Sequence, residues 1–216
     1  MGDSESEEAP VNNGFEALSY SIREQFEEFS GYLQVTRARG ILRRYFVMNA
    51  FDGAMTSLGV VIGSYITGIS VPSTIIGVIL VSGVAMAISG FTGTYMMESA
   101  ERSHSLNELE DAMLTDLEKT MYGRASRFVS LFAALVDGSA PFIAALPCIF
   151  PFMLASIALL PIHLAFYSSV GASLVVLFVL GVFLGRLSEK NLVYSGLKMV
   201  VAGTIVALIA LFLGGH

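Results

Sequence analysis

The sequence is poor in charged residues and has a single cysteine. Charged side chains make up 14% of its 216 residues, whereas a soluble domain has about a quarter. Hydrophobic residues make up 54%, and the mean hydropathy is +0.70. Cys148 alone cannot form an intrachain disulfide framework. The composition therefore argues against a soluble or disulfide-stabilised domain and indicates an all-α membrane protein.

Several functional signatures are also missing. The chain has no dense basic patch, so we expect no nucleic-acid partner. It has no Gly-rich phosphate loop, no HExxH and no Ser–His pair at a shared depth in the apolar segments, so we expect neither an enzyme nor a tightly bound cofactor. The acidic start, "MGDSESEEAPVNNG", lacks the basic and apolar regions of a secretory signal, and we expect the first apolar segment to direct membrane insertion.

Five apolar segments are long enough to cross a membrane, which takes about 20 helical residues. A long apolar run from 128 to 185 must contain two of them, and Pro147, Pro151 and Pro161 are expected to allow the turn between the two. The predicted spans cover about 45–67, 71–97, 128–154, 162–186 and 193–213.

Three polar segments lie outside these spans. Residues 1–13 are expected to be a disordered acidic tail. Residues 14–42 have apolar side chains at helical spacing, which predicts a cytoplasmic amphipathic helix. Such a helix lies on the membrane surface or docks on another part of the protein, and the sequence does not choose between the two. Residues 98–127 are predicted to form an acidic helical insert within the 43–213 membrane domain.

The twelve Lys and Arg residues decide the expected orientation. All of them precede the first span, separate the second from the third, or surround the join of the fourth and fifth. Because cytoplasmic loops are enriched in basic residues, we expect a cytoplasmic N-terminus, a cytoplasmic 98–127 segment and an external C-terminus.

Two spans open on related sequences. "RRYFVMNAFDGAM" opens the first and "RASRFVSLFAALVDGSAP" opens the third, and each leads from Arg at the membrane edge to Asp-Gly within the helix. Each unit contains two crossings, so the sequence predicts an internal parallel two-helix repeat. Transporters with such repeats bind substrate at the repeat interface.

The two aspartates of these repeats lie deep in the predicted membrane. Asp52 follows Arg44 by eight residues and Asp137 follows Arg127 by ten, which places them about 12 and 15 Å inside. Intramembrane acids usually face a bundle interior or a water-filled cavity and line ion or proton paths. The alternative is a protonated Asp that bonds a neighbouring backbone at a glycine kink.

The surroundings of Asp52 favour a cation. Met48, Asn49, Met55 and Thr56 share or flank its helical face. Carboxylate oxygen with thioether sulfur suits a divalent first-row cation, although this set does not select the metal. Methionine is also a common core filler, so packing alone is an alternative for both Met residues.

Acidic side chains recur on one face of the 98–127 segment. Glu101-x-x-His104 has the spacing of a pair found in di-iron bundles, and the same face carries Glu108, Asp111 and Glu118. We expect this face to collect cations, with a merely solvated acidic face as the alternative.

Three stretches resemble the vacuolar iron transporter family: "FDGAMTSLGVVIG", "AISGFTGTYMMESAE" and "LVDGSAPFIAALPCIFPF". The resemblance implies a homodimer with the pore at the subunit interface, a membrane aspartate matched by Asp52, and cytoplasmic glutamates matched by Glu98 and Glu101. The chain departs from the family at Gly90 and Thr94, where the family pattern has Met and Glu. Its cytoplasmic insert is also shorter than is usual in the family. We therefore expect a divergent prokaryotic member of the family, located in the cell membrane. Met86 or Met96 would replace the missing Met.

Together these observations predict a five-span transporter that exports Fe²⁺ or Mn²⁺ from the cytoplasm by proton antiport, with lipid, metal ions and protons as its partners. The metal is substrate here, and protonation of Asp52 would release it. The expected metal ligands are Asp52, Glu98, Glu101, His104, Glu108 and Asp111. The expected pathway residues are Asp52, Met48, Met55, Asn49, Asp137 and Met86. The alternatives are a membrane protein that does not transport but binds a partner or lipid surface through its cytoplasmic helices, and a transporter of another solute.

Overall fold

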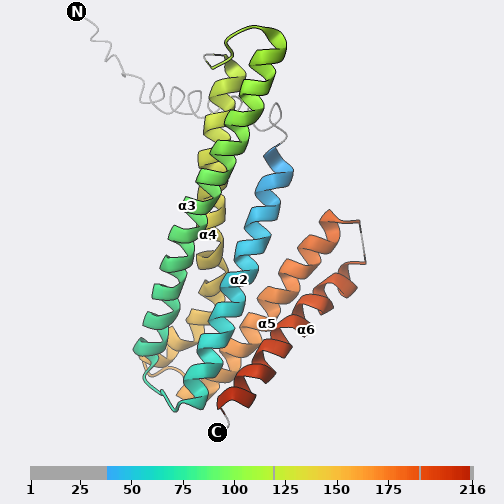
Figure 1. Ribbon diagram of the computed structural model, residues 1–216. Coiled ribbons are helices and arrows are strands. Elements are labelled where there is room, and N and C mark those ends of the chain that lie inside the picture. Colours follow the sequence, from blue (N-terminus) through green and yellow to red (C-terminus); the bar gives the residue numbers. More distant parts are fainter. Residues whose placement is uncertain (1–37, 119, 190, 215–216) are drawn as a thin grey trace, which may run out of the picture.

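The computed structural model describes residues 38–118, 120–189 and 191–214 and places them in five helices, with no strand among these residues (Figure 1). Each of the five is long and apolar enough to cross a membrane, which confirms the all-α fold with five spanning helices. The helices are α2 (Ala38–Ile66), α3 (Pro72–Met113), α4 (Met121–Ser156), α5 (Ile162–Leu187) and α6 (Leu192–Gly214).

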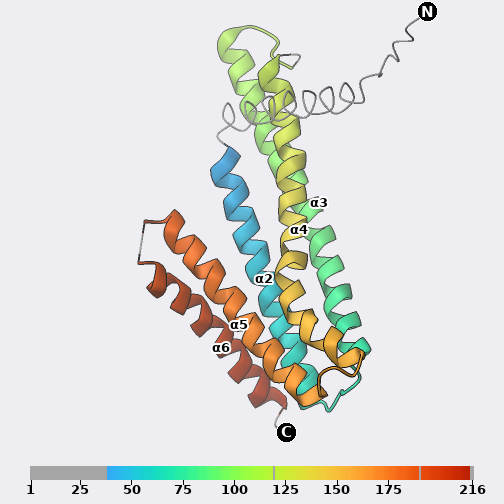
Figure 2. The ribbon, with the colours of Figure 1, turned by 180° about the vertical axis from the view of Figure 1, so that it is seen from behind.

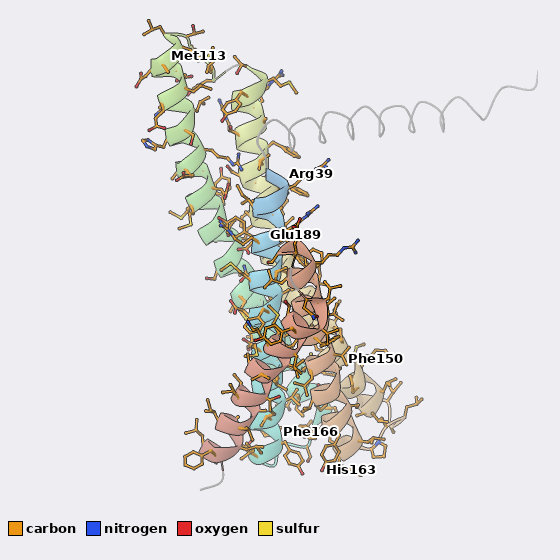
Figure 3. All side chains as sticks on the ribbon, turned by 90° about the vertical axis from the view of Figure 1, so that its right-hand side faces the viewer. Arg39, Met113, Phe150, His163, Phe166 and Glu189 are labelled. Atoms are coloured by element: carbon orange, nitrogen blue, oxygen red, sulfur yellow. The ribbon has the colours of Figure 1, made fainter. Side chains whose placement is uncertain are left out.

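The helices α3 and α4 are much longer than a bilayer requires. The 42 residues of α3 span about 63 Å, twice the roughly 30 Å of hydrocarbon. The last part of α3 and the first part of α4 therefore run on together as a hairpin beyond the other helices (Figures 1 and 2). Figure 3 places Met113 at the tip of this hairpin, beyond Arg39 and Glu189, and His163 at the opposite end of the molecule.

The predicted 98–127 insert corresponds to this hairpin. Residues 98–113 continue α3 without a break, and residues 121–127 begin α4. The tip is held by Glu110, whose Oε1 accepts from the Leu117 N–H at 2.7 Å, and by Thr120, whose hydroxyl caps α4 by accepting from the Gly123 N–H at 3.5 Å.

The expected role of two prolines in the turn after α4 is wrong. Pro147 and Pro151 lie inside α4, and the chain turns only after Ser156, with Pro161 immediately before α5. Spanning helices tolerate proline where neighbouring groups satisfy the freed backbone. Pro147 and Pro151 leave the carbonyls of Ile143 and Pro147 without a helical N–H donor, and the Ser169 hydroxyl of α5 donates to the adjacent Cys148 carbonyl at 2.7 Å.

The helix α2 lies in the middle of the bundle, between the α3–α4 pair and the α5–α6 pair (Figure 1). Its buried Ala54 and Leu58 pack against Ala144 of α4 and Leu177 of α5 in one apolar core. Small alanines let these helices approach closely, as is usual in membrane bundles. Apolar side chains also cover the outer surface, where Val81 of α3 is 70% exposed, as expected beside lipid.

The predicted acidic tail and most of the predicted 14–42 helix lie outside the described residues, and residues 38–42 form the first turns of α2. The internal repeat stays a prediction.

Candidate functional site

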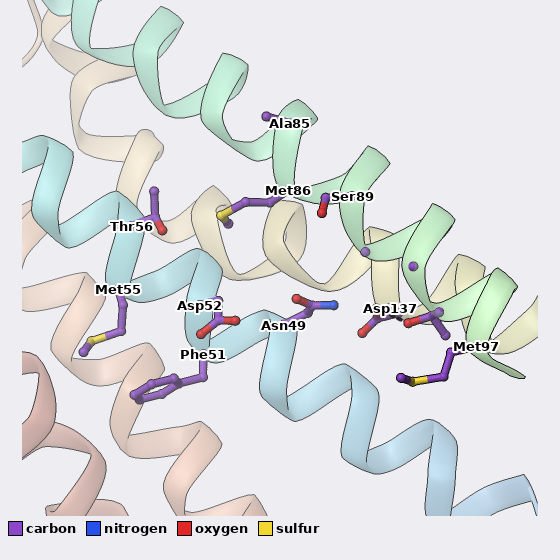
Figure 4. A pocket seen from close by; sticks show the side chains of 13 residues that line it. Asn49, Phe51, Asp52, Met55, Thr56, Ala85, Met86, Ser89, Met97 and Asp137 are labelled. Atoms are coloured by element: carbon purple, nitrogen blue, oxygen red, sulfur yellow. Dashed lines mark hydrogen bonds between the residues drawn. The ribbon is translucent and has the colours of Figure 1, made fainter.

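A cavity of about 900 Å³ lies between α2 and α3 and is backed by α4 (Figure 4). It occupies the middle of the spanning part of α2, about four turns from either end of that helix. Its lining residues are Asn49, Phe51, Asp52, Met55, Thr56, Ala85, Met86, Ser89, Gly90, Gly93, Thr94, Met97 and Asp137.

Five of the six predicted pathway residues line this cavity. Asp52, Asn49 and Met55 line it from α2, Met86 from α3 and Asp137 from α4. Met48 does not line the cavity, and its side chain is 59% exposed. The side chain of Asp52 is exposed to the cavity, and no basic side chain in the described part of the chain pairs with Asp52 or Asp137.

The glycines that follow the two aspartates are contact points between helices. A Cβ on Gly53 would lie 2.5 Å from the Cα of Pro141 in α4, and one on Gly138 would lie 2.9 Å from the carbonyl oxygen of Ala87 in α3. Both distances are too short for any other residue, so the glycines bring the backbones of α2, α4 and α3 together. Each aspartate is consequently held beside a helix contact and at the cavity wall.

Asp137 is buried, with 3% of its surface exposed. The Thr94 hydroxyl of α3 donates to its Oδ2 at 2.6 Å. A Cβ on Gly90 would lie 3.2 Å from the same Oδ2 and 3.0 Å from the Asn49 Nδ2. The two positions that depart from the family pattern, Gly90 and Thr94, are thus the ones that accommodate Asp137.

Glu98 follows Met97 of the cavity wall, and its carboxylate joins two helices instead of lining the cavity. It is only 6% exposed, and its two oxygens accept from the Tyr45 hydroxyl and from the Arg102 Nε, each at 3.0 Å. This arrangement ties α2 to α3 at the hairpin end of the cavity. The carboxylate that the sequence predicts as a metal ligand is therefore already paired within the chain.

The other predicted ligands on the hairpin remain apart from the cavity. Glu101, His104, Glu108 and Asp111 are exposed. His104 Nε2 lies 3.4 Å from Glu108 Oε1, with both side chains at least 70% exposed. Within the described residues, no three His, Cys, Asp or Glu side chains are grouped so as to hold a metal ion.

Sequence reasoning missed the partners of the two buried acids. Arg102 follows Glu98 by four residues, and this spacing alone predicts a pair on one helix face. By contrast, nothing in the sequence links Tyr45 to Glu98, 53 residues away, or Thr94 to Asp137, 43 residues away.

The comparisons with known proteins agree with this architecture. The sequence profile of the VIT family matches residues 107–215. An uncharacterized protein of Methanocaldococcus jannaschii is 31% identical over 169 residues, which cover 77% of this chain and 85% of that relative. No solved structure matches the chain. With five helices able to cross a membrane, the chain is an integral membrane protein. It belongs to the VIT family, which consists of membrane transporters of metal ions and not of enzymes.

Proposed function

We propose that this protein exports Fe²⁺ or Mn²⁺ from the cytoplasm in exchange for protons. The observation that carries the proposal is the position of Asp52, an acid without a basic partner in the described part of the chain, in a 900 Å³ cavity at mid-helix depth. An ionised carboxylate at this depth is costly unless a cation compensates it. Either a metal ion or a proton would do so, and the same group can exchange one for the other.

The cavity offers ligands of suitable chemistry. Met86 from the facing helix brings thioether sulfur to the same cavity as the Asp52 carboxylate, and Met55 lines the cavity from the helix of Asp52 but points away from Met86 (Figure 4). This mixture of oxygen and sulfur favours borderline cations such as Fe²⁺ over Ca²⁺ and Mg²⁺, which prefer oxygen alone. The metal passes through as substrate.

The basic residues indicate the orientation of the protein in the membrane, and export is the direction of transport that we propose. Arg39, Arg43 and Arg44 start α2, and Arg102, Arg124 and Arg127 lie on the hairpin. The positive-inside rule puts this end in the cytoplasm and the end of α6 outside the prokaryotic cell membrane. Export then carries metal from the hairpin end past Asp52, and protons move inward.

The hairpin would supply metal to the cavity. The exposed Glu101, His104, Glu108 and Asp111 form an acidic surface that raises the local cation concentration. Glu98 is not in this set, because its oxygens are paired with Tyr45 and Arg102. It would instead hold α2 and α3 at the mouth.

A homodimer would complete the pathway. The Asp52 side chain is exposed in a single chain, although lipid is an unsuitable neighbour for a carboxylate. A second copy that meets the first along α2 and α3 would cover the cavity, and cyclic dimers are the commonest oligomers.

The test is metal flux in proteoliposomes that hold the purified protein. With a proton gradient directed toward the side of the hairpin, Mn²⁺ or Fe²⁺ should move the other way, and Asp52→Asn should reduce this flux at least tenfold. The matched control is Asp116→Asn, which changes an exposed acid on the hairpin loop and should leave the flux unchanged. Normal flux in Asp52→Asn would refute the mechanism and would favour a structural role for Asp52.

A further inference from the structure

Asp137 has an unused oxygen. One oxygen, Oδ2, accepts from Thr94, but Oδ1 is the one buried side-chain nitrogen or oxygen in the described part of the chain that has no hydrogen-bond partner. A buried acceptor left without a partner costs about 1–3 kcal/mol, and more if it is charged. Asp137 lines the cavity although Oδ1 itself is buried, so a ligand in the cavity would remove this cost once the carboxyl group turns Oδ1 toward it.

Two further polar side chains from other helices lie beside Asp137. The Thr94 hydroxyl is 2.6 Å from Oδ2, and the Asn49 Nδ2 and the Asp137 Oδ2 both border the space that a side chain at position 90 would fill. Figure 4 shows Asn49 between Asp52 and Asp137. The Asn49 amide carries an acceptor oxygen beside this nitrogen, and a half-turn about χ2 exchanges the two, so three helices can bring three oxygen ligands to one place.

We propose that Asp137, Thr94 and Asn49 form a second divalent-cation site in the cavity, based on oxygen donors and separate from Asp52. This inference rests on the proposed function and deepens it. Asn49 precedes Asp52 by three residues, about one helical turn nearer the hairpin. A cation that enters from the hairpin end therefore meets the Asp137 site first.

The two sites differ in chemistry. The Asp137 site offers carboxylate, hydroxyl and amide oxygens, which suit Mn²⁺ well, whereas Met86 projects from α3 into the part of the cavity that Asp52 lines. Of the two methionines that follow Thr94, Met97 lines the cavity beside Asp137 (Figure 4), and its side chain is 68% exposed. Transfer from one site to the other would select a cation that both ligand sets accept.

Mn²⁺ binding to the purified full-length protein tests this site, with free Mn²⁺ measured by electron paramagnetic resonance. If Asp52 is the only site, Asp52→Asn removes all specific binding. We expect instead that Asp52→Asn keeps one class of Mn²⁺ site and that adding Asp137→Asn weakens it at least tenfold. An asparagine at 137 keeps an acceptor for Thr94, so this variant should fold.

Two glycines of α3 provide a matched pair for the same measurement in the Asp52→Asn background. Gly90→Ala would place a Cβ 3.2 Å from Asp137 Oδ2 and 3.0 Å from Asn49 Nδ2, whereas Gly93→Ala, also at the cavity, meets nothing within 4 Å. Weaker Mn²⁺ binding in Gly90→Ala with unchanged binding in Gly93→Ala supports the site.

The site is refuted if Asp52→Asn binds no Mn²⁺, or if its remaining binding is indifferent to Asp137→Asn. These results would leave Asp52-dependent flux intact, so they are distinguishable from failure of the proposed transport, in which the wild-type protein neither binds nor moves metal.

Discussion

The contact between Gly53 of α2 and Pro141 of α4 should be intolerant of a single methyl group. In Gly53→Ala, the new Cβ would lie 2.5 Å from the Pro141 Cα and 2.7 Å from its carbonyl oxygen. Carbon atoms pack at about 3.5–4.0 Å, so the two helices must separate by about 1 Å. Both contacts are backbone atoms, which cannot rotate away. Overpacking of this kind costs about 1–3 kcal/mol, and the better helix propensity of alanine returns about 1 kcal/mol.

Because both clashing atoms belong to the backbone, we expect an overpacking cost near the upper end of this range. Gly53→Ala should then lower the free energy of unfolding by about 2 kcal/mol. For a chain of this size the loss corresponds to a melting temperature lower by about 4–8 °C. The assay is thermal unfolding in detergent, with metal flux as a second measurement because Asp52 is the adjacent residue.

Gly59→Ala is the matched control. It lies on the same helix, its Cβ meets nothing within 4 Å, and it should stabilise the protein by up to about 1 kcal/mol. Equal melting temperatures for the two variants would refute the argument that a close α2–α4 contact requires Gly53.

Two further predictions concern buried polar groups. Arg102→Met leaves the Glu98 carboxylate, 6% exposed, without its ion pair, and should destabilise the protein by about 3 kcal/mol in thermal unfolding. Arg127→Met, which breaks an exposed 3.8 Å pair with Glu118, should cost less than about 1 kcal/mol, and equal losses would contradict this assignment. Cys148 is fully buried with its Sγ 3.0 Å from the Ser173 hydroxyl. A maleimide should therefore label it only after denaturation, and equally fast labelling of the native protein would count against the packing of α4 on α5.

Hydropathy located the membrane crossings because each one is a local property of about 20 residues. The predicted spans lie within or close to the five helices, and the far-side turn comes after 156, as the predicted end of the third span at about 154 suggests. Hydropathy did not show that α3 continues to Met113, since it detects where a helix leaves the lipid and not where its backbone hydrogen bonds end. The expectation that Pro147 and Pro151 lie in the turn is wrong because a spanning helix tolerates proline where neighbouring groups satisfy the freed backbone.

Some features of the candidate site are likewise recognisable from the sequence, and others only from the structure. Asp52 and Asp137 are recognisable from the sequence because an acid in an apolar span is rare and costly. Their shared Asp-Gly setting leaves open whether the glycine bends the helix or admits another backbone. The structure shows that Gly53 and Gly138 admit Pro141 and Ala87 respectively.

The sequence by itself determines the membrane class, the five crossings, the family and the presence of two acids within the spans, because all of these follow from the identity and order of neighbouring residues. Only the tertiary structure decides that Asp137 is held by Thr94, that Glu98 is paired with Tyr45 as well as Arg102, and that Asp52 and Asp137 line one cavity. Apart from Arg102, which shares α3 with Glu98, these partners lie on different helices. They meet because small residues let α2, α3 and α4 pack closely, and the distance between side chains on packed helices is not encoded in any local pattern.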